Sequence, residues 1–324
     1  MRVLVTGGGG YIGSIAIERL VEKGYDVVAL DSFYRGHKPA IHPDAEPITC
    51  DLRQPDETLR AVERSNAEAV LHFAALHLVP ESVTSPGEYY GTNVGGGINL
   101  LNAVKDIGVP RFVFSSTAAV YGEPKSLPIR EDDPKEPINP YGHSKWIIEQ
   151  LLPVYAEQYK LNYAAFRYFN VAGATEERGE DHRPETHVIP VALEVLLGKR
   201  ERFTIFGTDY PTEDGTAIRD YVHVVDLVDA HIEAIQRLDK PLGAINLGTR
   251  DGFSVKQIVE SVERVTGRSL PVTYGERREG DPPALIADTK NAREVLGWQP
   301  TRSNMDEMIG SAWEWMQKHP NGYE

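Results

Sequence analysis

The sequence predicts an α/β fold in which a doubly wound parallel sheet is joined to a smaller α/β lobe at its C-terminal end. Short apolar runs typical of buried strands alternate with longer segments of helical period, and these runs occupy residues 3–6, 27–30, 69–73, 112–115 and 163–166. Such alternation is expected of a parallel sheet whose two faces are covered by helices. It stops after Arg167, and residues 173–184 are rich in glycine and charge, so we place the second lobe beyond that point.

The length and composition suit a globular protein with a large core. The chain has 324 residues, of which 41% are hydrophobic, enough for one large domain or two unequal ones. Its net charge of −14 argues against nucleic acid or an anionic membrane as a partner, because both require a basic face. No apolar run approaches the roughly 20 residues of a membrane span, and the lone Cys50 cannot form an internal disulfide. We therefore expect a soluble, cytoplasmic protein without a membrane partner.

The first strand runs into a glycine loop, and a helical pattern follows at once. Gly7, Gly10 and Gly13 come directly after the apolar residues 3–5. Backbone amides and a helix N-terminus can face a pyrophosphate there with no side chain in the way. Asp31 ends the next strand, where a carboxylate accepts hydrogen bonds from the adenosine ribose and repels a 2′-phosphate. The arrangement predicts NAD as the cofactor, in preference to NADP.

Tyr141 and Lys145 are one helical turn apart in a predicted helix. Asn139 and Pro140 suit the N-cap and the first position of that helix, so the tyrosine and the lysine share one face. A free tyrosine has a pKa of about 10 and is a poor base at neutral pH. A nearby ammonium and the positively charged nicotinamide ring would favour the phenolate. The pair therefore predicts a proton transfer beside the nicotinamide.

Three consecutive hydroxyls, Ser115, Ser116 and Thr117, stand at the end of the strand predicted at 112–115. Strand ends at the carboxyl edge of a doubly wound sheet are where ligands bind, so one of these hydroxyls can share the substrate proton. Serine and threonine at a strand end also cap backbone groups. The spacing alone does not choose among the three.

With these pieces assembled, the chain resembles the extended short-chain dehydrogenase/reductase superfamily, and within it the UDP-glucose 4-epimerases (UDP-galactose 4-epimerases), nearly end to end. The resemblance rests on VTGGGGYIGS at 5–14, HFAA at 72–75, FSSTAAVYG at 114–122, YGHSK at 141–145, RYFN at 167–170, FGTDYPTEDGT at 206–216, IRDYVHV at 218–224 and RREGD at 277–281.

This resemblance implies reversible epimerisation of a UDP-sugar at C4. Tyr141 would take the proton of the sugar 4-hydroxyl while NAD takes the C4 hydride, which gives a 4-keto sugar. Lys145 would tune the tyrosine, and the third catalytic hydroxyl falls on Thr117, where many relatives have serine. The ketose would turn over in the site and receive the hydride on its other face, so NAD is regenerated and stays bound.

The resemblance also implies which residues line the two ligands. Cofactor contacts are expected from Gly7, Gly10, Tyr11, Ile12, Gly13, Asp31, Asp51, Leu52, Phe73, Ala74, Ala75, His77, Asn93, Ser115, Tyr141, Lys145 and Tyr168. Substrate contacts are expected from Thr117, Tyr141, Asn170, His187, Val188, Phe206, Arg219, Tyr221, Arg278, Asp281 and Leu285. Guanidiniums can fork onto phosphate oxygens and an aromatic ring can cover a base.

Residues 1–170 are thus expected to form an NAD-binding Rossmann domain, and 171–324 a nucleotide-sugar-binding lobe. Residues 226–247 again combine a helical pattern with a strand, so we expect the chain to return to the first domain over about 225–250. Leu285 is intermediate between the bulky tyrosine and the small residue that relatives carry in the sugar pocket. UDP-glucose and UDP-galactose are the expected substrates, with the UDP-GlcNAc/UDP-GalNAc pair depending on Leu285.

Other activities share the cofactor loop and the Tyr–Lys pair. Nucleotide-sugar dehydratases and decarboxylases carry acidic residues where this chain has Ala118 and Ala119, so elimination would lack its acid and base. A 4-epimerase of UDP-pentoses or UDP-uronic acids is a closer alternative. A non-catalytic NAD-binding protein would be expected to lose the Tyr141–Lys145 pair.

The remaining expectations concern metals and assembly. The ten histidines show no paired metal-ligand spacing, so no metal is expected. The helical segments at 88–107 and 141–159 carry more apolar surface than one sheet covers, and the resemblance implies a homodimer made by such helices. Pro153 should interrupt and bend the second segment.

Overall fold

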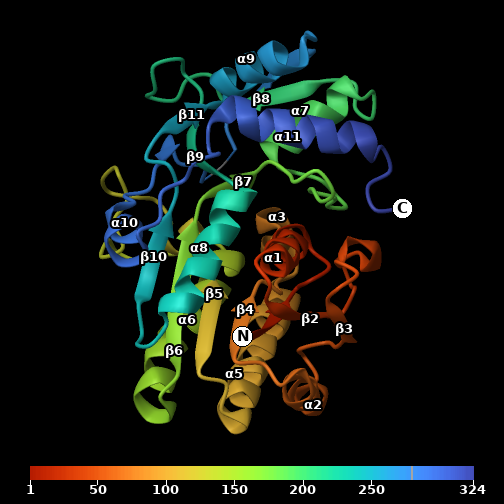
Figure 1. The fold of residues 1–324 in the computed structure, drawn as a ribbon. Coiled ribbons are helices and arrows are strands. Elements are labelled where there is room, and N and C mark those ends of the chain that lie inside the picture. Colours follow the sequence, from red (N-terminus) through yellow and green to blue (C-terminus); the bar gives the residue numbers. More distant parts are fainter. Residues whose placement is uncertain (279) are drawn as a thin grey trace.

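A computed structural model describes residues 1–278 and 280–324. Its main feature is a seven-stranded sheet in the order β10-β6-β5-β4-β1-β2-β3 (Figure 1), and all neighbouring strands in it run parallel. The order reverses between β1 and β4, and a switch point of this kind opens a ligand crevice at the carboxyl ends of the strands. The strands are β1 (Arg2–Thr6), β2 (Asp26–Asp31), β3 (Glu46–Thr49), β4 (Ala69–His72), β5 (Arg111–Ser115), β6 (Asn162–Tyr168) and β10 (Gly243–Leu247).

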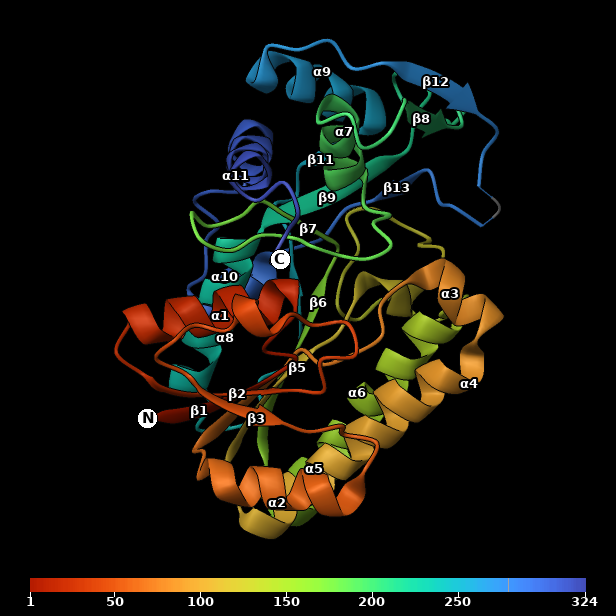
Figure 2. The same cartoon turned by 90° about the vertical axis from the view of Figure 1, so that its right-hand side faces the viewer.

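Helices cover both faces of this sheet (Figure 2). One face carries α1 and α8, and the other carries α2, α5 and α6. Along β1, Val3 and Val5 join the core on the first face, whereas Leu4 joins the core on the second. A strand that is buried on both faces reads as a continuous apolar run. The helices are α1 (Tyr11–Glu22), α2 (Pro55–Ser65), α5 (Gly96–Ile107), α6 (Pro140–Tyr159) and α8 (Val224–Arg237).

The five runs predicted as strands are β1, β2, β4, β5 and β6, which confirms the predicted fold class. The prediction missed β3, whose residues include a glutamate and Pro47. This strand is at the edge of the sheet and pairs only with β2. Proline has no N–H to donate and is confined to such edges, so β3 lacks the apolar signal of a central strand.

The helix and strand expected over 226–247 are present as α8 and β10. α8 packs beside α1, and β10 pairs in parallel with β6 as the last strand of the large sheet. The chain thus contributes to the large sheet after it has begun the smaller lobe. The short α10 (Lys290–Leu296) packs against these two elements.

The smaller lobe stands above the carboxyl ends of the large sheet in Figure 1. Its central strand is β9, which pairs with β7, β11 and β13, while β8 and β12 form a separate pair. The strands are β7 (Asn170–Ala172), β8 (Phe203–Phe206), β9 (Ile218–His223), β11 (Gly252–Ser254), β12 (Val272–Gly275) and β13 (Ala284–Leu285). Around them pack α7 (Val188–Leu196), α9 (Val255–Thr266) and α11 (Met305–Lys318).

The helix expected over 88–107 is present as a continuous run of α4 (Pro86–Tyr89), a π turn (Tyr90–Gly95) and α5, with α3 (Val79–Thr84) before it. Another helix prediction needs correction. The interruption expected at Pro153 was wrong, because α6 continues through it to Tyr159. Pro153 lies on the exposed side of α6, where solvent can hydrate the carbonyl that loses its partner. Among the helices of the described residues, none is both long and apolar enough to cross a membrane.

Candidate active site

A cavity of about 1400 Å³ lies at the carboxyl ends of the large sheet, lined by the loops after β1, β2, β4 and β5 and by residues of the smaller lobe. It exceeds the roughly 300–1,000 Å³ usual for one small ligand. The cavity therefore has room for a dinucleotide and a second ligand together.

The glycine loop forms one wall of this cavity. Gly7 has φ +74°, and a Cβ added at Gly13 would lie 2.0 Å from the Gly7 carbonyl oxygen, so the loop and the start of α1 meet at a distance that only glycine permits. The Asp31 carboxylate accepts hydrogen bonds from the N–H groups of Gly9 (2.9 Å) and Phe33 (2.7 Å). Burial raises the pKa of Asp31, and these two N–H groups oppose the rise. The carboxylate thereby holds the loops after β1 and β2 together at the cavity.

The Tyr141–Lys145 pair is presented by the first turns of α6. This helix begins at Pro140, and the Asn139 side chain accepts a hydrogen bond from the Gly142 N–H at 2.8 Å, which confirms the predicted cap. The Lys145 ammonium donates to the Ser115 carbonyl oxygen at 2.8 Å. Burial lowers the pKa of Lys145 to about 7, against the opposing effect of Glu149. The lysine therefore changes charge near neutral pH.

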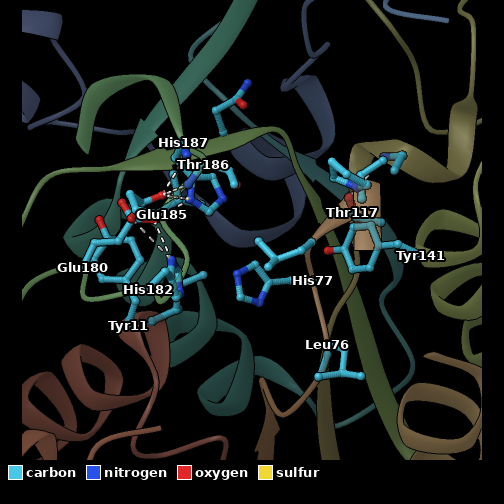
Figure 3. Close-up of a pocket in the computed structure, with 18 of the residues that line it drawn as sticks. Tyr11, Leu76, His77, Thr117, Tyr141, Glu180, His182, Glu185, Thr186 and His187 are labelled. Carbon is cyan, nitrogen blue, oxygen red and sulfur yellow. Dashed lines mark hydrogen bonds and ion pairs between the residues drawn. The ribbon is translucent and has the colours of Figure 1, made fainter. Parts of the chain in front are cut away.

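Tyr141 is joined to the end of β5 through a hydroxyl. Burial raises the pKa of Tyr141, and a hydrogen bond with Thr117 lowers it, so the phenol is protonated at neutral pH in the protein alone. Figure 3 shows the two side chains next to each other in the cavity.

The structure also separates the three hydroxyls at the end of β5. The Ser115 hydroxyl is hydrogen-bonded to the Tyr168 hydroxyl, and the Ser116 hydroxyl donates a hydrogen bond to the buried Glu149 carboxylate. Thr117 is the one that meets Tyr141, and its oxygen also accepts the Ala119 N–H at 3.1 Å. Thr117 is thus the hydroxyl placed to share a proton with the tyrosine.

The smaller lobe contributes charged and aromatic side chains to the same cavity. The Arg219 guanidinium is paired with Asp281, and the Arg278 guanidinium lies 4.4 Å from the centre of the exposed Phe206 ring. Leu285 is half-buried and packs beside residues 118–121. Arginine beside an aromatic ring can recognise a nucleoside diphosphate. Glu279, which belongs to the RREGD motif, lies outside the described residues.

All but one of the residues expected to contact ligands line this cavity. The exception is Asn93, which is buried behind the wall. Its amide donates to the Leu76 carbonyl (2.9 Å) and to the Ser144 hydroxyl (3.0 Å), and its oxygen accepts the Leu76 N–H (2.8 Å). These bonds occupy the amide, so Asn93 holds the cavity wall in place and does not itself line the cavity.

Sequence reasoning missed a group of side chains in the wall near Tyr11. Glu180, His182 and Glu185 line the cavity together with His187, and Figure 3 shows them gathered opposite Thr117 and Tyr141. The signal available was the run E-x-H-x-x-E-x-H over 180–187. It fits neither a helix face nor a strand face, so a search for regular metal-ligand spacing passes over it.

Comparison with known proteins agrees with this fold. The family model of the NAD dependent epimerase/dehydratase family matches residues 3–248. A UDP-glucose 4-epimerase of Lactobacillus helveticus is 49% identical over 328 residues, covering 100% of this chain and 99% of that protein. The chain belongs to the NAD dependent epimerase/dehydratase family.

Two solved structures are similar over nearly the whole chain. The UDP-glucose 4-epimerase of Brucella ovis in complex with NAD has a TM-score of 0.93 and 44% identity, covering 96% of this chain and 97% of that one. The UDP-glucose 4-epimerase of Bifidobacterium longum in complex with NAD+ and UDP has a TM-score of 0.93 and 36% identity, covering 99% of each chain.

Proposed function

We propose that the protein catalyses the reversible C4 epimerisation of UDP-glucose and UDP-galactose, with NAD retained through the turnover. The observation that carries this proposal is a single cavity lined by the glycine loop, by the Tyr141–Thr117 pair and by Arg219 and Arg278. The relatives at 44–49% identity over nearly their full length are UDP-glucose 4-epimerases.

The residues present fit NAD. The approach of Gly13 to Gly7 leaves no room for a Cβ, so backbone N–H groups can come close to a pyrophosphate. Asp31 ends β2 at the position that suits a ribose hydroxyl. Held there by the glycine loop and Asp31, the cofactor would supply a reversible hydride acceptor for C4 of the sugar.

The proton of the 4-hydroxyl is assigned to Tyr141. Its phenol is protonated in the protein alone because of burial, so it becomes a base only when positive charge is brought near it. Oxidised nicotinamide would bring that charge, in addition to the charge that Lys145 carries when it is protonated. Thr117 connects the sugar oxygen with the phenol through its hydroxyl and can pass the proton in both directions.

The smaller lobe is proposed to hold the UDP group while the 4-keto sugar turns over. Arg219 and Arg278 would bind the diphosphate, and Phe206 would cover the uracil. Because the anchor is on UDP, the sugar ring can present either face of C4 to the hydride donor. In this proposal, residues 1–170 with 225–250 bind NAD, and the rest of 171–324 binds the nucleotide sugar.

The test is to mix the purified protein with UDP-galactose without added NAD and to follow the sugar anomeric signals by proton NMR. Conversion to UDP-glucose is expected. The Tyr141→Phe variant should lose about 10²–10⁴-fold in kcat, the usual worth of a positioned acid–base group. Tyr274→Phe, at an exposed tyrosine outside the cavity, is the matched control and should keep full activity.

If neither hexose changes even after NAD is supplied, the proposal fails. UDP-pentoses and UDP-uronic acids are then the substrates to test. Dehydratase and decarboxylase chemistry has less support, because Ala118 and Ala119 offer no acid or base beside Thr117.

Leu285 is proposed to set how far 2-acetamido sugars are accepted. It lines the cavity beside Ala118, and a difference of a few carbon atoms in an apolar pocket discriminates by only about 1–3 kcal/mol. We therefore expect measurable turnover of UDP-GalNAc beside UDP-galactose. Running both sugars in parallel NMR samples tests this point.

A homodimer in the cytoplasm is proposed as the working form. Large apolar side chains are exposed on two helices: Val154 and Tyr159 of α6 have about half of their surface exposed, and Ile107 of α5 has more than a third. A second copy of the chain would cover them. The buried Cys50 needs no oxidising compartment. Sedimentation equilibrium should give twice the chain mass, and charged substitutions at Val154 and Tyr159 should give monomers.

A further inference from the structure

His77 and His187, which the resemblance places at the cofactor and the substrate, belong to a larger histidine and glutamate group in the cavity wall, whose other members have no role in the proposed epimerisation. It consists of Glu180, His182, Glu185 and His187, with His77 beside them, and is called the His–Glu cluster below. One ligand atom from each of the four residues at 180–187 lies within 4.8 Å of the others, and ring nitrogens of the three histidines meet the same limit. We propose that this cluster binds a divalent transition metal, with Zn²⁺ as the best match.

Several potential ligand atoms of the cluster lie close to one point. The Oε1 atom of Glu180 lies 2.9 Å from Nδ1 of His182 and 2.8 Å from Nδ1 of His187. The same His187 nitrogen lies 2.8 Å from Oε1 of Glu185. An Nδ1 atom carries at most one hydrogen, so His187 faces two carboxylate oxygens with one proton to offer. A cation between the groups would satisfy all of them.

The two carboxylates of the cluster are buried charged groups. The side chains of Glu180 and Glu185 are only 8% and 5% exposed, so two carboxylates are largely removed from water. His187 lies against both carboxylates and, when protonated, offsets one of their two negative charges. Buried charge is normally paired or bound to metal, and a divalent ion would neutralise both carboxylates.

His77 has a ring nitrogen without a hydrogen-bond partner among the described residues. This atom, Nε2, is buried, although buried polar atoms are nearly always satisfied. The His77 ring centre lies 4.4 Å from that of His182 and 5.9 Å from that of His187. In the view of Figure 3, His77 lies between the cluster and Tyr141. The ring is therefore available as a further nitrogen ligand.

Groups outside the ligand atoms fix the position of Glu185 in the cluster. Oε1 of Glu185 accepts the backbone N–H groups of Thr186 (2.6 Å) and His187 (2.7 Å), and Arg200 binds the Glu185 carbonyl oxygen at 2.8 Å. Such outer contacts orient metal ligands. Bonds of 2.0–2.1 Å in a tetrahedral zinc site place ligand atoms about 3.4 Å apart, so the present spacings of 2.8–2.9 Å need to widen by only about 0.5 Å.

Imidazole with carboxylate suits Zn²⁺ and its neighbours in the first transition series, whereas Mg²⁺ and Ca²⁺ prefer all-oxygen sites. The metal would join His77, in the segment after β4, to the 180–187 segment that leads into α7. Its role would be a structural link across the cavity wall, independent of whether the proposed epimerase activity is correct.

The experiment measures metal on the full-length protein, purified without a histidine tag. Metal content is determined by elemental mass spectrometry, and Zn²⁺ affinity by competition with a chromogenic chelator. About one Zn²⁺ per chain is expected, and Co²⁺ in its place should show the visible absorption bands of a tetrahedral site. At free Zn²⁺ of 100 times its Kd, the Tm should rise by about 4 °C.

His182→Ala should weaken Zn²⁺ binding by about 100-fold or more, the upper range found even for outer contacts, and should remove the Tm rise. His42→Asn is the matched control, since the ring of this histidine is hydrogen-bonded to Asp44 and lies outside the cavity, and it should bind as the parent does. If His182→Ala does not fold, Glu185→Gln and His77→Asn make the same comparison. Absence of a saturable site on the parent chain, or equal binding by His182→Ala and His42→Asn, would overturn the proposal.

Discussion

Replacing Lys145 with methionine should make the protein more stable while it stops turnover. The ammonium is buried, and its pKa is lowered from 10.5 to about 7. Because one pH unit corresponds to 1.36 kcal/mol, burial of this charge destabilises the fold by up to about 5 kcal/mol. Methionine removes that charge but leaves the Ser115 carbonyl without its donor, which costs about 1–3 kcal/mol. The free energy of unfolding at pH 6.5 should therefore rise by about 2–4 kcal/mol.

The pH dependence gives this prediction its sign. Between pH 7 and pH 10.5 the unfolded chain holds a proton on Lys145 that the folded chain lacks, so the stability of the parent protein rises over this window. The advantage of the variant should be complete below pH 7. As the pH approaches 10.5 the parent regains up to about 5 kcal/mol, so the variant should become the less stable protein by about 1–3 kcal/mol. The assay is urea unfolding of protein freed of NAD, at pH 6.5 and pH 10.

Lys199→Met is the control, because Lys199 is exposed and its substitution should shift stability equally at both pH values. The reasoning is refuted if Lys145→Met is no more stable than the parent at pH 6.5, or if its advantage does not shrink by pH 10. A stabilised but inactive variant would identify Lys145 as a functional group held in the site at the expense of stability.

Three further predictions follow from the packing of the cavity. Arg167→Met should destabilise the fold by about 3–5 kcal/mol in urea unfolding, because it leaves the buried Glu149 carboxylate without its ion-pair partner. The double variant with Glu149→Met should recover most of this loss. If the losses of the two single variants simply add in the double variant, the explanation is contradicted. Gly13→Ala should release NAD, read from the absorbance of the purified protein, because a Cβ there would lie 2.0 Å from a backbone oxygen of the same loop. Gly87→Ala, where the added Cβ has no atom of the described residues within 4 Å beyond its own helix backbone and chain neighbours, should retain NAD, and retention by both variants would refute the steric argument. Leu285→Tyr should lower kcat/KM for UDP-GalNAc by about 10–100-fold relative to UDP-galactose, and an unchanged ratio would remove this side chain from the specificity pocket.

The predictions that succeeded from the sequence rest on local patterns. The five central strands are apolar because both of their faces are buried, and this leaves continuous runs in the sequence. The glycine loop and the helix cap at Asn139 are each written within a few consecutive residues, since turn and cap geometry depends on nearest neighbours. Tyr141 and Lys145 share a helix face because they are one turn apart.

What only the tertiary structure decided concerns side chains whose partners are distant in the chain. Three adjacent hydroxyls are equivalent in the sequence, and the choice of Thr117 is made by the packing of α6 against the end of β5. The amide of Asn93 is hydrogen-bonded to Leu76 and Ser144 behind the cavity wall, and the sequence did not predict these partners. His77 comes beside the His–Glu cluster of residues 180–187 only because the segment after β4 packs against that segment. Sequence spacing fixes which residues share a helix or a strand face, whereas hydrogen-bond partners and ligand sets depend on how separate elements pack together.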